Sequence, residues 1–453
     1  MTKTMTEGNP LRLIIEFTIP LLLGNLLQQT YNIVDAAIVG QVLGTQALAG
    51  VGATSSVQFL VIGFLVGVTC GFGIPIAKTF GAGDYKRLRC QFFHALFLSA
   101  VLALFLTILC TVFCSRILML LSTPKDIYTD AYNYLFILFL GIPFTLLYNL
   151  LSAVLRAVGD SKTPFFFLAF ATILNIILDL LFIKVFQWGC VGAAVATITA
   201  QAVSGILCAC VIYSRYRLLR PAREDCHLHP TEIRNMIVMG VPMGLQYSIT
   251  AVGSMVMQSA NNGLGSVYVS GFTVGMRLKQ FFMCPFDAIA TAVSVFCSQN
   301  LGAGKIQRIK KGMRQGILVG VTYGVIAGMV LILAGRVFSG LFLKGNEVAV
   351  LDAASRYLLG QGCFFWVLGI LNVCRMTTQG LGYAGRAVFS GVMEMIARIA
   401  VSTLLVPVYG YSVICFTDPS AWLSASIYIV PTCFICLSHI RLQGVEKGGK
   451  IEV

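Results

Sequence analysis

Residues 173–183 read ILNIILDLLFI, so an aspartate, Asp179, stands in a run of apolar residues. Asn175 lies four positions earlier, on the same face of any helix that this run forms. An ionised carboxylate is unfavourable among apolar side chains unless it has a partner or a function. The surroundings of this run therefore decide what kind of protein the chain forms.

The composition of the chain is that of a membrane protein. Of its 453 residues, 57% are hydrophobic and only 11% are charged, whereas soluble domains carry about 25% charged residues. Apolar stretches of about 20 residues, long enough to cross a bilayer, recur from end to end. Open sheets cannot satisfy their backbone in lipid, and the stretches do not alternate as barrel strands do. We predict an all-α membrane protein whose twelve transmembrane helices cover residues 14–38, 50–78, 91–113, 131–157, 164–186, 190–213, 232–261, 267–298, 315–338, 354–380, 387–408 and 411–440.

The positive charges indicate how the chain is oriented. The net charge of +14 would suggest a nucleic-acid partner in a soluble protein, but the positive-inside rule explains it better in a membrane protein. With the N-terminus in the cytoplasm, 22 of the 32 Lys and Arg residues fall on the cytoplasmic side, 6 on the other side and 4 within spans. We therefore expect a multi-pass protein of the cell (plasma or inner) membrane with both termini cytoplasmic, and no nucleic-acid partner.

The two halves of the sequence resemble each other. LGTQALAG (43–50) matches LGSVYVSG (264–271), and FGAGDYKR (80–87) matches LGAGKIQR (301–308), both at an offset of 221 residues. Because six helices per repeat is an even number, both repeats enter the membrane from the same side, which makes a parallel repeat of two six-helix bundles. We predict an N-terminal lobe (1–213), a basic cytoplasmic linker (214–231), a C-terminal lobe (232–441) and a cytoplasmic tail (442–453).

Two prolines also match between the halves, Pro20 and Pro242, at an offset of 222 residues. A proline inside a helix removes a backbone hydrogen bond and allows the helix to bend. Two repeated bundles of this kind suit alternating access, in which one bundle rocks against the other around a central site. We predict Pro20 and Pro242 as hinges.

Three predicted helices of the first half each carry a polar face. These faces hold Gln28, Asn32 and Asp35; Asn175 and Asp179; and Thr197 and Gln201. A charged Asp at a helix centre costs about 2.5–3.5 kcal/mol, whereas a polar contact between membrane helices returns roughly 0.6 kcal/mol on average. Carboxylate, amide and hydroxyl oxygens suit a proton or a hard cation such as Na⁺. We predict an ion-coupling site of Asp35, Asn175, Asp179 and Thr197, with static helix pairing as the alternative.

The second half carries different polar residues. Its first helix has a polar stripe without an acid, and Glu394 and Arg398 stand at i, i+4, which is most simply a neutralising ion pair. The roles of Arg277, Lys279, Asp287 and Arg375 stay open at this stage. The residues that we expect to contact a substrate are Gln28, Asn32, Gln201, Gln246, Thr250 and Met257.

In the order and spacing of its motifs, the chain resembles the MATE (multidrug and toxic compound extrusion) transporters. The resemblance rests on IPLLLGNLLQQTYNIVDAAIVGQVLGTQALAGVG (19–52), FGAGDYKR (80–87), LRAVGDSKTP (155–164) and NIILDL (175–180), and in the second half on VPMGLQ (241–246) and CSQNLGAGK (297–305). It implies twelve helices in two lobes that open alternately to either side. It also implies export of amphipathic, often cationic compounds, driven by entry of H⁺ or Na⁺.

The same resemblance implies an ion site at Asp35, Asn175, Asp179 and Thr197 and a helix bend at Pro20. Some members of the family carry an acid in the seventh helix, where this chain offers Thr250. This difference favours the first lobe as the place of ion coupling.

The nearest alternative is a flippase for lipid-linked oligosaccharides or polysaccharides, in which Arg277, Lys279 and Arg375 would bind an anionic head group. An enzyme is less favoured because the sequence has neither H-E-x-x-H nor G-x-S-x-G. We expect no catalytic residue, no cofactor, and no metal beyond possible Na⁺ at Asp35 and Asp179. The expected partners are small-molecule substrates and the lipid bilayer, with the protein a monomer.

Overall fold

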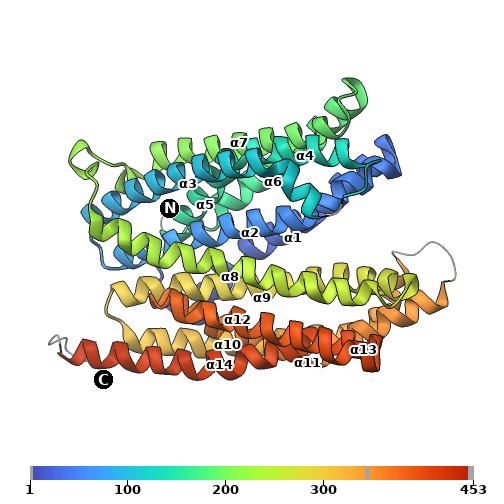
Figure 1. Ribbon diagram of the computed structural model, residues 1–453. Helices are drawn as coiled ribbons and strands as arrows, with labels where there is room; N and C mark the ends of the chain where they lie inside the picture. The colour runs from blue at the N-terminus through green and yellow to red at the C-terminus, as the bar shows by residue number, and fades with distance from the viewer. Residues whose placement is uncertain (1–3, 122, 342–346, 447–453) are drawn as a thin grey trace. The chain divides into compact units, whose positions relative to one another are not determined.

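The computed structural model describes residues 4–121, 123–341 and 347–446, and all regular secondary structure in these ranges is helical (Figure 1). The predicted tail, 442–453, lies outside the described residues from 447 onward. The first half contains α1 (Pro10–Leu43), α2 (Thr45–Gly81), α3 (Tyr85–Leu120), α4 (Tyr128–Leu140), α5 (Ile142–Ala157), α6 (Lys162–Asp179), the π-helix η1 (Leu180–Val185) and α7 (Gly189–Arg215). The 3-10 turns η2 (Arg217–Leu219) and η3 (Arg223–Asp225) precede α8 (Pro230–Asn262), α9 (Ser266–Gly302), α10 (Ile306–Gly340), α11 (Val348–Gly380), α12 (Ala384–Ala400), the π-helix η4 (Val401–Leu405), α13 (Val406–Tyr409) and α14 (Tyr411–Glu446).

These helices account for the twelve predicted spans. In the described residues, eleven helices are long and apolar enough to cross a bilayer, and α4 with α5 makes a twelfth span that bends by 49°. The bend lies at Gly141 and Pro143, where glycine is flexible and proline cannot donate a backbone hydrogen bond. The corresponding span of the second half, α11, contains no proline and is continuous. The predicted all-α membrane fold is confirmed.

The two halves repeat each other in backbone conformation as well as in sequence. Helices α2 and α9 both have 37 residues. The glycines before them, Gly44 and Gly265, have φ of 90° and 105°, and the glycines after them, Gly83 and Gly304, have φ of 73° and 72°. Glycine adopts positive φ without the steric penalty of a side chain. The fifth span of each half also ends in a short π-helix, η1 or η4. The predicted repeat is therefore confirmed.

Contacts divide the chain into two compact units. Unit 1 is Leu23–Gly244, and unit 2 is Thr4–Leu22 together with the described residues from Leu245 onward. The division falls inside α1, two residues after Pro20, and inside α8, two residues after Pro242. Both matched prolines therefore stand where a helix passes from one compact unit into the other. The lobe limits predicted from the sequence repeat, 213 and 232, stay a prediction.

Both described ends of the chain belong to unit 2 and lie at the same end of its helices. Asn300, near the junction of α9 and α10, donates to the carbonyl of Met5 at 3.1 Å. Arg386, just after the junction of α11 and α12, lies 3.5 Å from the sulfur of Cys436 in α14. Because α9, α10, α11 and α12 alternate in direction, the two junctions share one end of the unit.

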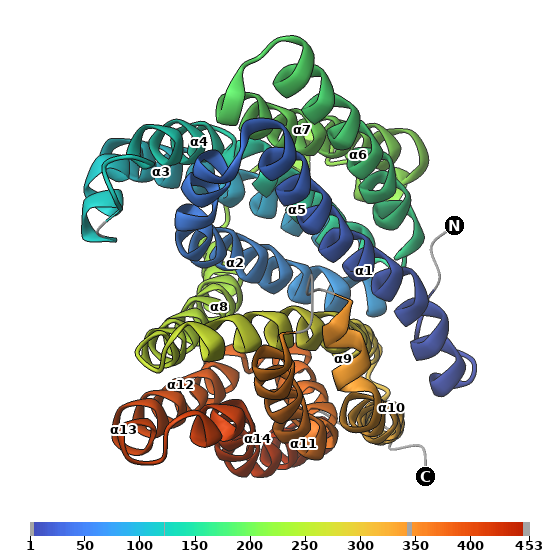
Figure 2. The same ribbon diagram turned by 90° about the vertical axis from the view of Figure 1, so that its right-hand side faces the viewer.

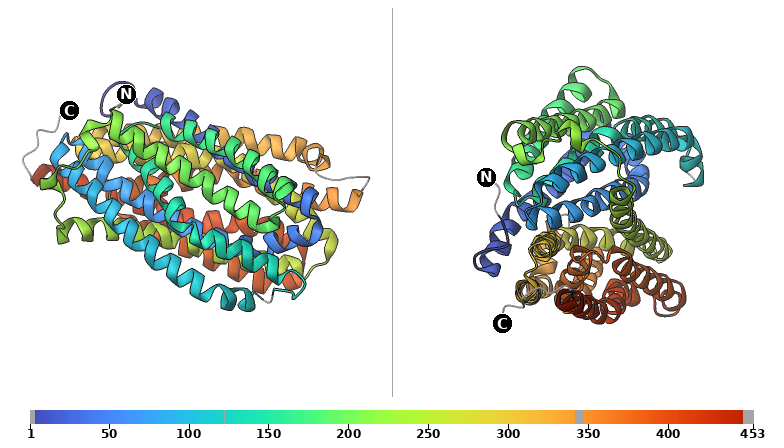
Figure 3. Two further views of the ribbon diagram at one scale, coloured as in Figure 1. Left: turned by 90° about the horizontal axis from the view of Figure 1, so that it is seen from above. Right: turned by 90° about the vertical axis from the view of Figure 1, so that its left-hand side faces the viewer.

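Within unit 2, α9, α10, α11, α12 and α14 lie side by side (Figure 2) and run lengthwise together (Figure 3). Helices α10 and α11 approach closely along a line of glycines. A methyl group at Gly328 would lie 2.3 Å from the carbonyl oxygen of Gly362, and one at Gly324 would lie 2.6 Å from the Cα of Trp366. Small residues allow membrane helices to gain van der Waals contact between their backbones.

The glycine contact gives a stability prediction with an internal control. Gly328→Ala should lower the thermal unfolding temperature of the detergent-solubilised protein, because overpacking costs about 1–3 kcal/mol. Gly340→Ala, at the end of the same helix, meets only a Leu351 side-chain carbon at 3.9 Å. It should leave the unfolding temperature unchanged or raise it, since Ala favours helix over Gly by about 1 kcal/mol. Equal unfolding temperatures for the two variants would contradict the close contact.

Candidate functional site

Two carboxylates meet inside unit 1. Asp35 lies in the second part of α1, Asp179 is the last residue of α6, and their side chains interact with each other. Asp35 is 9% exposed and Asp179 is 0% exposed. Two ionised carboxylates in contact repel each other, so a proton or a small cation between them would stabilise the pair. Unit 1 therefore holds an acidic pair within its membrane spans.

Asn175 and Thr197 join the carboxylate pair to α7. Asn175 is 1% exposed. With its amide nitrogen turned toward Asp179, it donates to Oδ2 at 2.8 Å, and its oxygen accepts from the backbone N–H of Thr197 at 3.2 Å. The Thr197 hydroxyl lies 3.0 Å from the hydroxyl of Tyr31, one turn before Asp35. The structure thus brings together all four residues of the predicted ion site, while their role in coupling stays a prediction.

Sequence reasoning missed three residues around the pair. Tyr134 of α4 is 4% exposed and interacts with Gln58 of α2. Tyr31 and Tyr134 both interact electrostatically with Asp35 and with Asp179, which places their hydroxyls close to the carboxylates. Tyr31 stands four residues before Asp35, so helical spacing was a usable signal. No periodicity in the sequence points to Gln58 or Tyr134.

The carboxylate pair keeps free acceptor atoms. One oxygen of Asp35, one of Asp179 and the side-chain oxygen of Gln201 are buried without a hydrogen-bond partner among the described residues. No described base forms an ion pair with either aspartate. Buried acceptors are normally satisfied by a donor, a water or an ion, and hard cations such as Na⁺ prefer oxygen ligands. The residues present therefore fit a proton and also fit a small hard cation.

The substrate-contact residues predicted in unit 1 differ in accessibility. Gln28 and Asn32 are exposed, and Gln201 is half-buried. Gln28, Asn32 and Asp35 share one face of α1, so a ligand on this face would lie next to the carboxylate pair. Their accessibility is compatible with the predicted contact.

The substrate-contact residues predicted in unit 2 are less accessible. Gln246 is 5% exposed and accepts from the amide of Gln379 at 2.7 Å. The half-buried Thr250 donates to the carbonyl of Gln246 at 3.0 Å. Met257 is 1% exposed and belongs to the hydrophobic core of the unit. In this structure Gln246 and Met257 do not offer a free side chain to a ligand, and their predicted role stays untested.

Unit 2 contains a buried chain of alternating charges. Lys279 of α9 and Arg398 of α12 both bind Asp418 of α14, at 2.5 Å and 2.9 Å. Arg398 also lies 3.4 Å from Glu394, and Glu394 pairs with Arg375 of α11. The predicted pair of Glu394 with Arg398 is confirmed, as one link of a larger network. The network connects four helices and places bases at both of its ends.

Residues of this network stand at the positions of the second repeat that correspond to the polar cluster of unit 1. The corresponding residues are Gln58 with Lys279 and Thr197 with Asp418, at an offset of 221 residues, and Tyr134 with Tyr357 and Asn175 with Arg398, at an offset of 223. The contacts correspond as well, because the fifth and sixth spans meet through these positions in each unit. Tyr357 donates to Asp418 at 3.1 Å. One repeated site thus holds neutral polar groups beside two acids in unit 1 and paired charges in unit 2.

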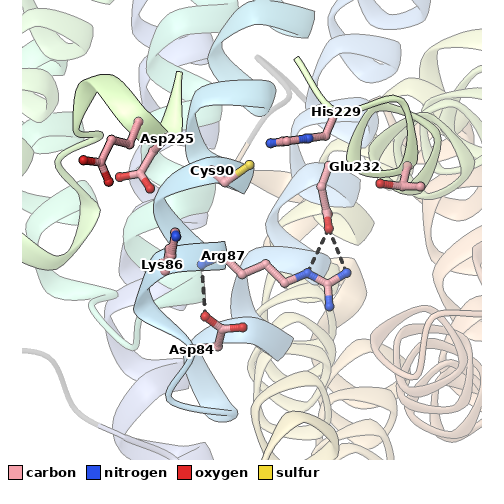
Figure 4. A pocket seen from close by; sticks show the side chains of 9 residues that line it. Asp84, Lys86, Arg87, Cys90, Asp225, His229 and Glu232 are labelled. Atoms are coloured by element: carbon pink, nitrogen blue, oxygen red, sulfur yellow. Dashed lines mark hydrogen bonds and ion pairs between the residues drawn. The ribbon is translucent and has the colours of Figure 1, made fainter. Parts of the chain in front are cut away.

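A separate pocket of about 300 Å³ lies in unit 1 between the start of α3 and the segment that leads into α8 (Figure 4). Arg87 pairs with Glu232 at 2.8 Å, and Arg89 pairs with Asp225 at 2.7 Å. Burial raises the pKa of the Asp225 carboxyl, but hydrogen bonds from Arg89 and from a backbone N–H bring that pKa below its usual value. The Asp225 pair connects the predicted linker, 214–231, to α3, and the Glu232 pair connects the start of α8 to α3. We therefore assign the pocket a structural role.

The buried network predicts a large difference between two Asp→Asn substitutions in unit 2. Asp418→Asn removes the counter-charge of Lys279 and Arg398, and breaking a buried ion pair in this way costs about 3–5 kcal/mol. Asp352→Asn breaks a surface pair with Arg336, whose side chains are 46% and 59% exposed, and should cost about 0–1 kcal/mol. Thermal unfolding of the purified variants measures both effects. A similar, small loss in the two variants would show that the network adds nothing to stability.

Comparison with known proteins agrees with this fold. The chain is 33% identical over 310 residues to the probable multidrug resistance protein YpnP of Bacillus subtilis (strain 168), covering 67% of this chain and 68% of that protein. It is 24% identical over 457 residues to the multidrug export protein MepA of Staphylococcus haemolyticus (strain JCSC1435), covering 99% and 98%. A solved outward-facing multidrug resistance MATE family transporter of the MOP superfamily shares the fold, with a TM-score of 0.90, 20% identity, and coverage of 96% of this chain and 98% of that one. The MatE family profile matches residues 20–181 and again residues 242–404, once in each repeat, and the chain belongs to the MatE (MATE) family.

Proposed function

We propose that this protein is a secondary active efflux transporter that exports small amphipathic, often cationic compounds in exchange for H⁺ or Na⁺. The observation that carries the proposal is the buried pair of Asp35 and Asp179, whose side chains interact with each other and which has no ion-paired base among the described residues. An ionised acid without a partner costs about 2.5–3.5 kcal/mol at the centre of a membrane span. The presence of two such acids is therefore best explained if their charge serves the function of the protein. The printed names of the relatives, which refer to multidrug resistance and export, support small-molecule substrates and do not favour the flippase alternative.

Ion and substrate compete for the same negative charge in the proposed cycle. In the outward-open state Asp35 and Asp179 take up a proton or Na⁺, and this neutralisation weakens the attraction for a cationic substrate. The substrate leaves, and the inward-open state releases the ion into the cytoplasm. Because each ligand lowers the affinity for the other, the coupling is reciprocal. No covalent step is needed, so we propose a transporter without catalytic residues or a cofactor.

Pro20 and Pro242 are the proposed hinges of this cycle. Each stands two residues before the point at which its helix passes from one compact unit to the other. A proline leaves one backbone carbonyl of the helix without its usual partner, which lowers the cost of bending there. Residues at such positions can absorb the change in backbone angles while the packed units move as bodies.

We place the protein in the cell membrane with both termini in the cytoplasm. Two observations support this orientation: the excess of Lys and Arg on that side, and the common end of unit 2 at which the described chain begins and ends. One chain supplies both repeats, and Asp35, Asn175, Asp179 and Thr197 all come from unit 1. A monomer therefore suffices for the proposed function.

The coupling proposal predicts loss of transport in two conservative variants. Asp35→Asn and Asp179→Asn keep the side-chain size but remove the charge for which ion and substrate compete. In proteoliposomes, uptake of a cationic dye such as ethidium should fall to the level of protein-free vesicles in both variants, with the pH and Na⁺ gradients varied independently. The wild-type protein should follow one of the two gradients.

The matched control is Asp352→Asn, which alters an exposed carboxylate of unit 2. It should transport at the wild-type rate, and all variants should be compared at equal amounts of folded protein. Wild-type rates in both Asp35→Asn and Asp179→Asn would show that the pair is structural and that coupling lies elsewhere.

A further inference from the structure

Helix α9 carries a polar face that the ion-coupling site does not use. Polar residues recur along this helix at intervals of four, seven, fourteen and eighteen residues from the first, which is the spacing of a single helical face. They are Thr273, Arg277, Gln280, Asp287 and Thr291. The first four are exposed and the last is half-buried, whereas the residues on the opposite side of the helix are buried in unit 2.

Arg277 and Lys279, two basic residues of α9, differ in their exposure and in their partners. Lys279 is 6% exposed and is bound to Asp418 in the buried network. Arg277, two residues earlier, points to the other side of the helix and is exposed. Among the described residues, Arg277 has no ion pair and no hydrogen bond from its side chain. The packing of unit 2 therefore does not explain Arg277.

The other charges of unit 2 do not neutralise Arg277. Asp287, on the same face, is ten residues away, which is about 15 Å along a helix. The base that acts on Asp287 is Arg375. The buried network contains three bases (Lys279, Arg375 and Arg398) but only two acids, so it adds positive potential behind this face.

An unpaired guanidinium within a span is unfavourable against lipid, so this face of α9 must meet water or a ligand. Guanidinium presents its N–H groups in a planar fork that matches a carboxylate or a phosphate. Gln280 stands three residues after Arg277 and adds an amide donor on the same face. Its side chain also has no hydrogen-bond partner among the described residues. Together they present several donors to a single anionic group.

We propose that Arg277, assisted by Gln280, binds the anionic group of a transported compound. The inference rests on the proposed export function and extends its substrate class: amphipathic compounds that carry a carboxylate or phosphate, including zwitterions, are transported as well as simple cations. Arg277 is therefore a specificity residue.

The test uses two dyes that differ in one charge. Rhodamine 110 carries a carboxylate and a cationic ring system, and rhodamine 123 is its methyl ester and carries the cation alone. Binding of each dye is measured to the full-length protein in vesicles of neutral lipid, so that no anionic head group competes. Arg277→Gln should weaken binding of rhodamine 110 about tenfold, the size expected for one charge-assisted contact, and leave rhodamine 123 unchanged. Arg277→Lys, which keeps the charge, should weaken binding of rhodamine 110 less than Arg277→Gln does.

Arg336→Gln is the matched control, because Arg336 is an exposed base of unit 2 that pairs with Asp352. It should leave the binding of both dyes unchanged. The inference is overturned if Arg277→Gln weakens both dyes equally, which indicates a structural role, if it weakens neither, or if the wild-type protein does not bind rhodamine 110. Gradient-driven uptake of rhodamine 123 by the wild-type protein and its loss in Asp179→Asn test the proposed function separately, since neither measurement involves a carboxylate on the dye.

Discussion

The cost of holding a charge inside the hydrocarbon layer is the constraint on which the arrangement of both units depends. At about 2.5–3.5 kcal/mol for a charge at the helix centre, no charged side chain is retained there without compensation. Unit 2 offsets this cost by alternating acids and bases, since each buried acid of its network lies between two bases. Unit 1 has no described base beside Asp35 and Asp179, and some of their buried oxygens lack a hydrogen-bond partner. The charges of unit 2 are neutralised within the protein, whereas the acids of unit 1 would need a proton or a cation from solution.

The two solutions are built on one backbone. The repeats agree in the glycines that start and end α2 and α9, and in the π-helices that end their fifth spans. At the repeat positions of Asn175 and Thr197, however, unit 2 has Arg398 and Asp418. The backbone thus brings the fifth and sixth spans together in both units, and the side chains decide whether the contact is neutral or charged.

Much of this could be predicted from the sequence, because membrane insertion leaves a strong signal in the composition. The twelve spans follow from apolar runs of the length of a bilayer, and the repeat follows from glycines at a constant offset. The pairing of Asp35, Asn175, Asp179 and Thr197 was also accessible, because polar residues are rare in spans and helical spacing places them on defined faces.

The remaining residues of the site could not be predicted by periodicity. Gln58 and Tyr134 are single polar residues on apolar helices, and only the packing of α2 against α4 brings them together. Lys279 and Asp418 are 139 residues apart, and neither helical spacing nor local composition links them. The repeat did contain the missing information, since the two residues correspond to Gln58 and Thr197. A repeated fold allows each contact in one half to predict a contact in the other.

This correspondence also explains why ion coupling would belong to unit 1 alone. In unit 2 the ammonium group of Lys279 already lies 2.5 Å from Asp418, so this acid is not available to a mobile cation. A tethered cation acts at an effective concentration in the millimolar range or above, and Arg398 adds a second permanent charge. A proton or Na⁺ from solution would have to displace both. Unit 1 has Gln58 at the repeat position of Lys279, and no described base pairs with its buried carboxylates. These carboxylates would therefore be free to bind the exchangeable ion that the proposed coupling requires.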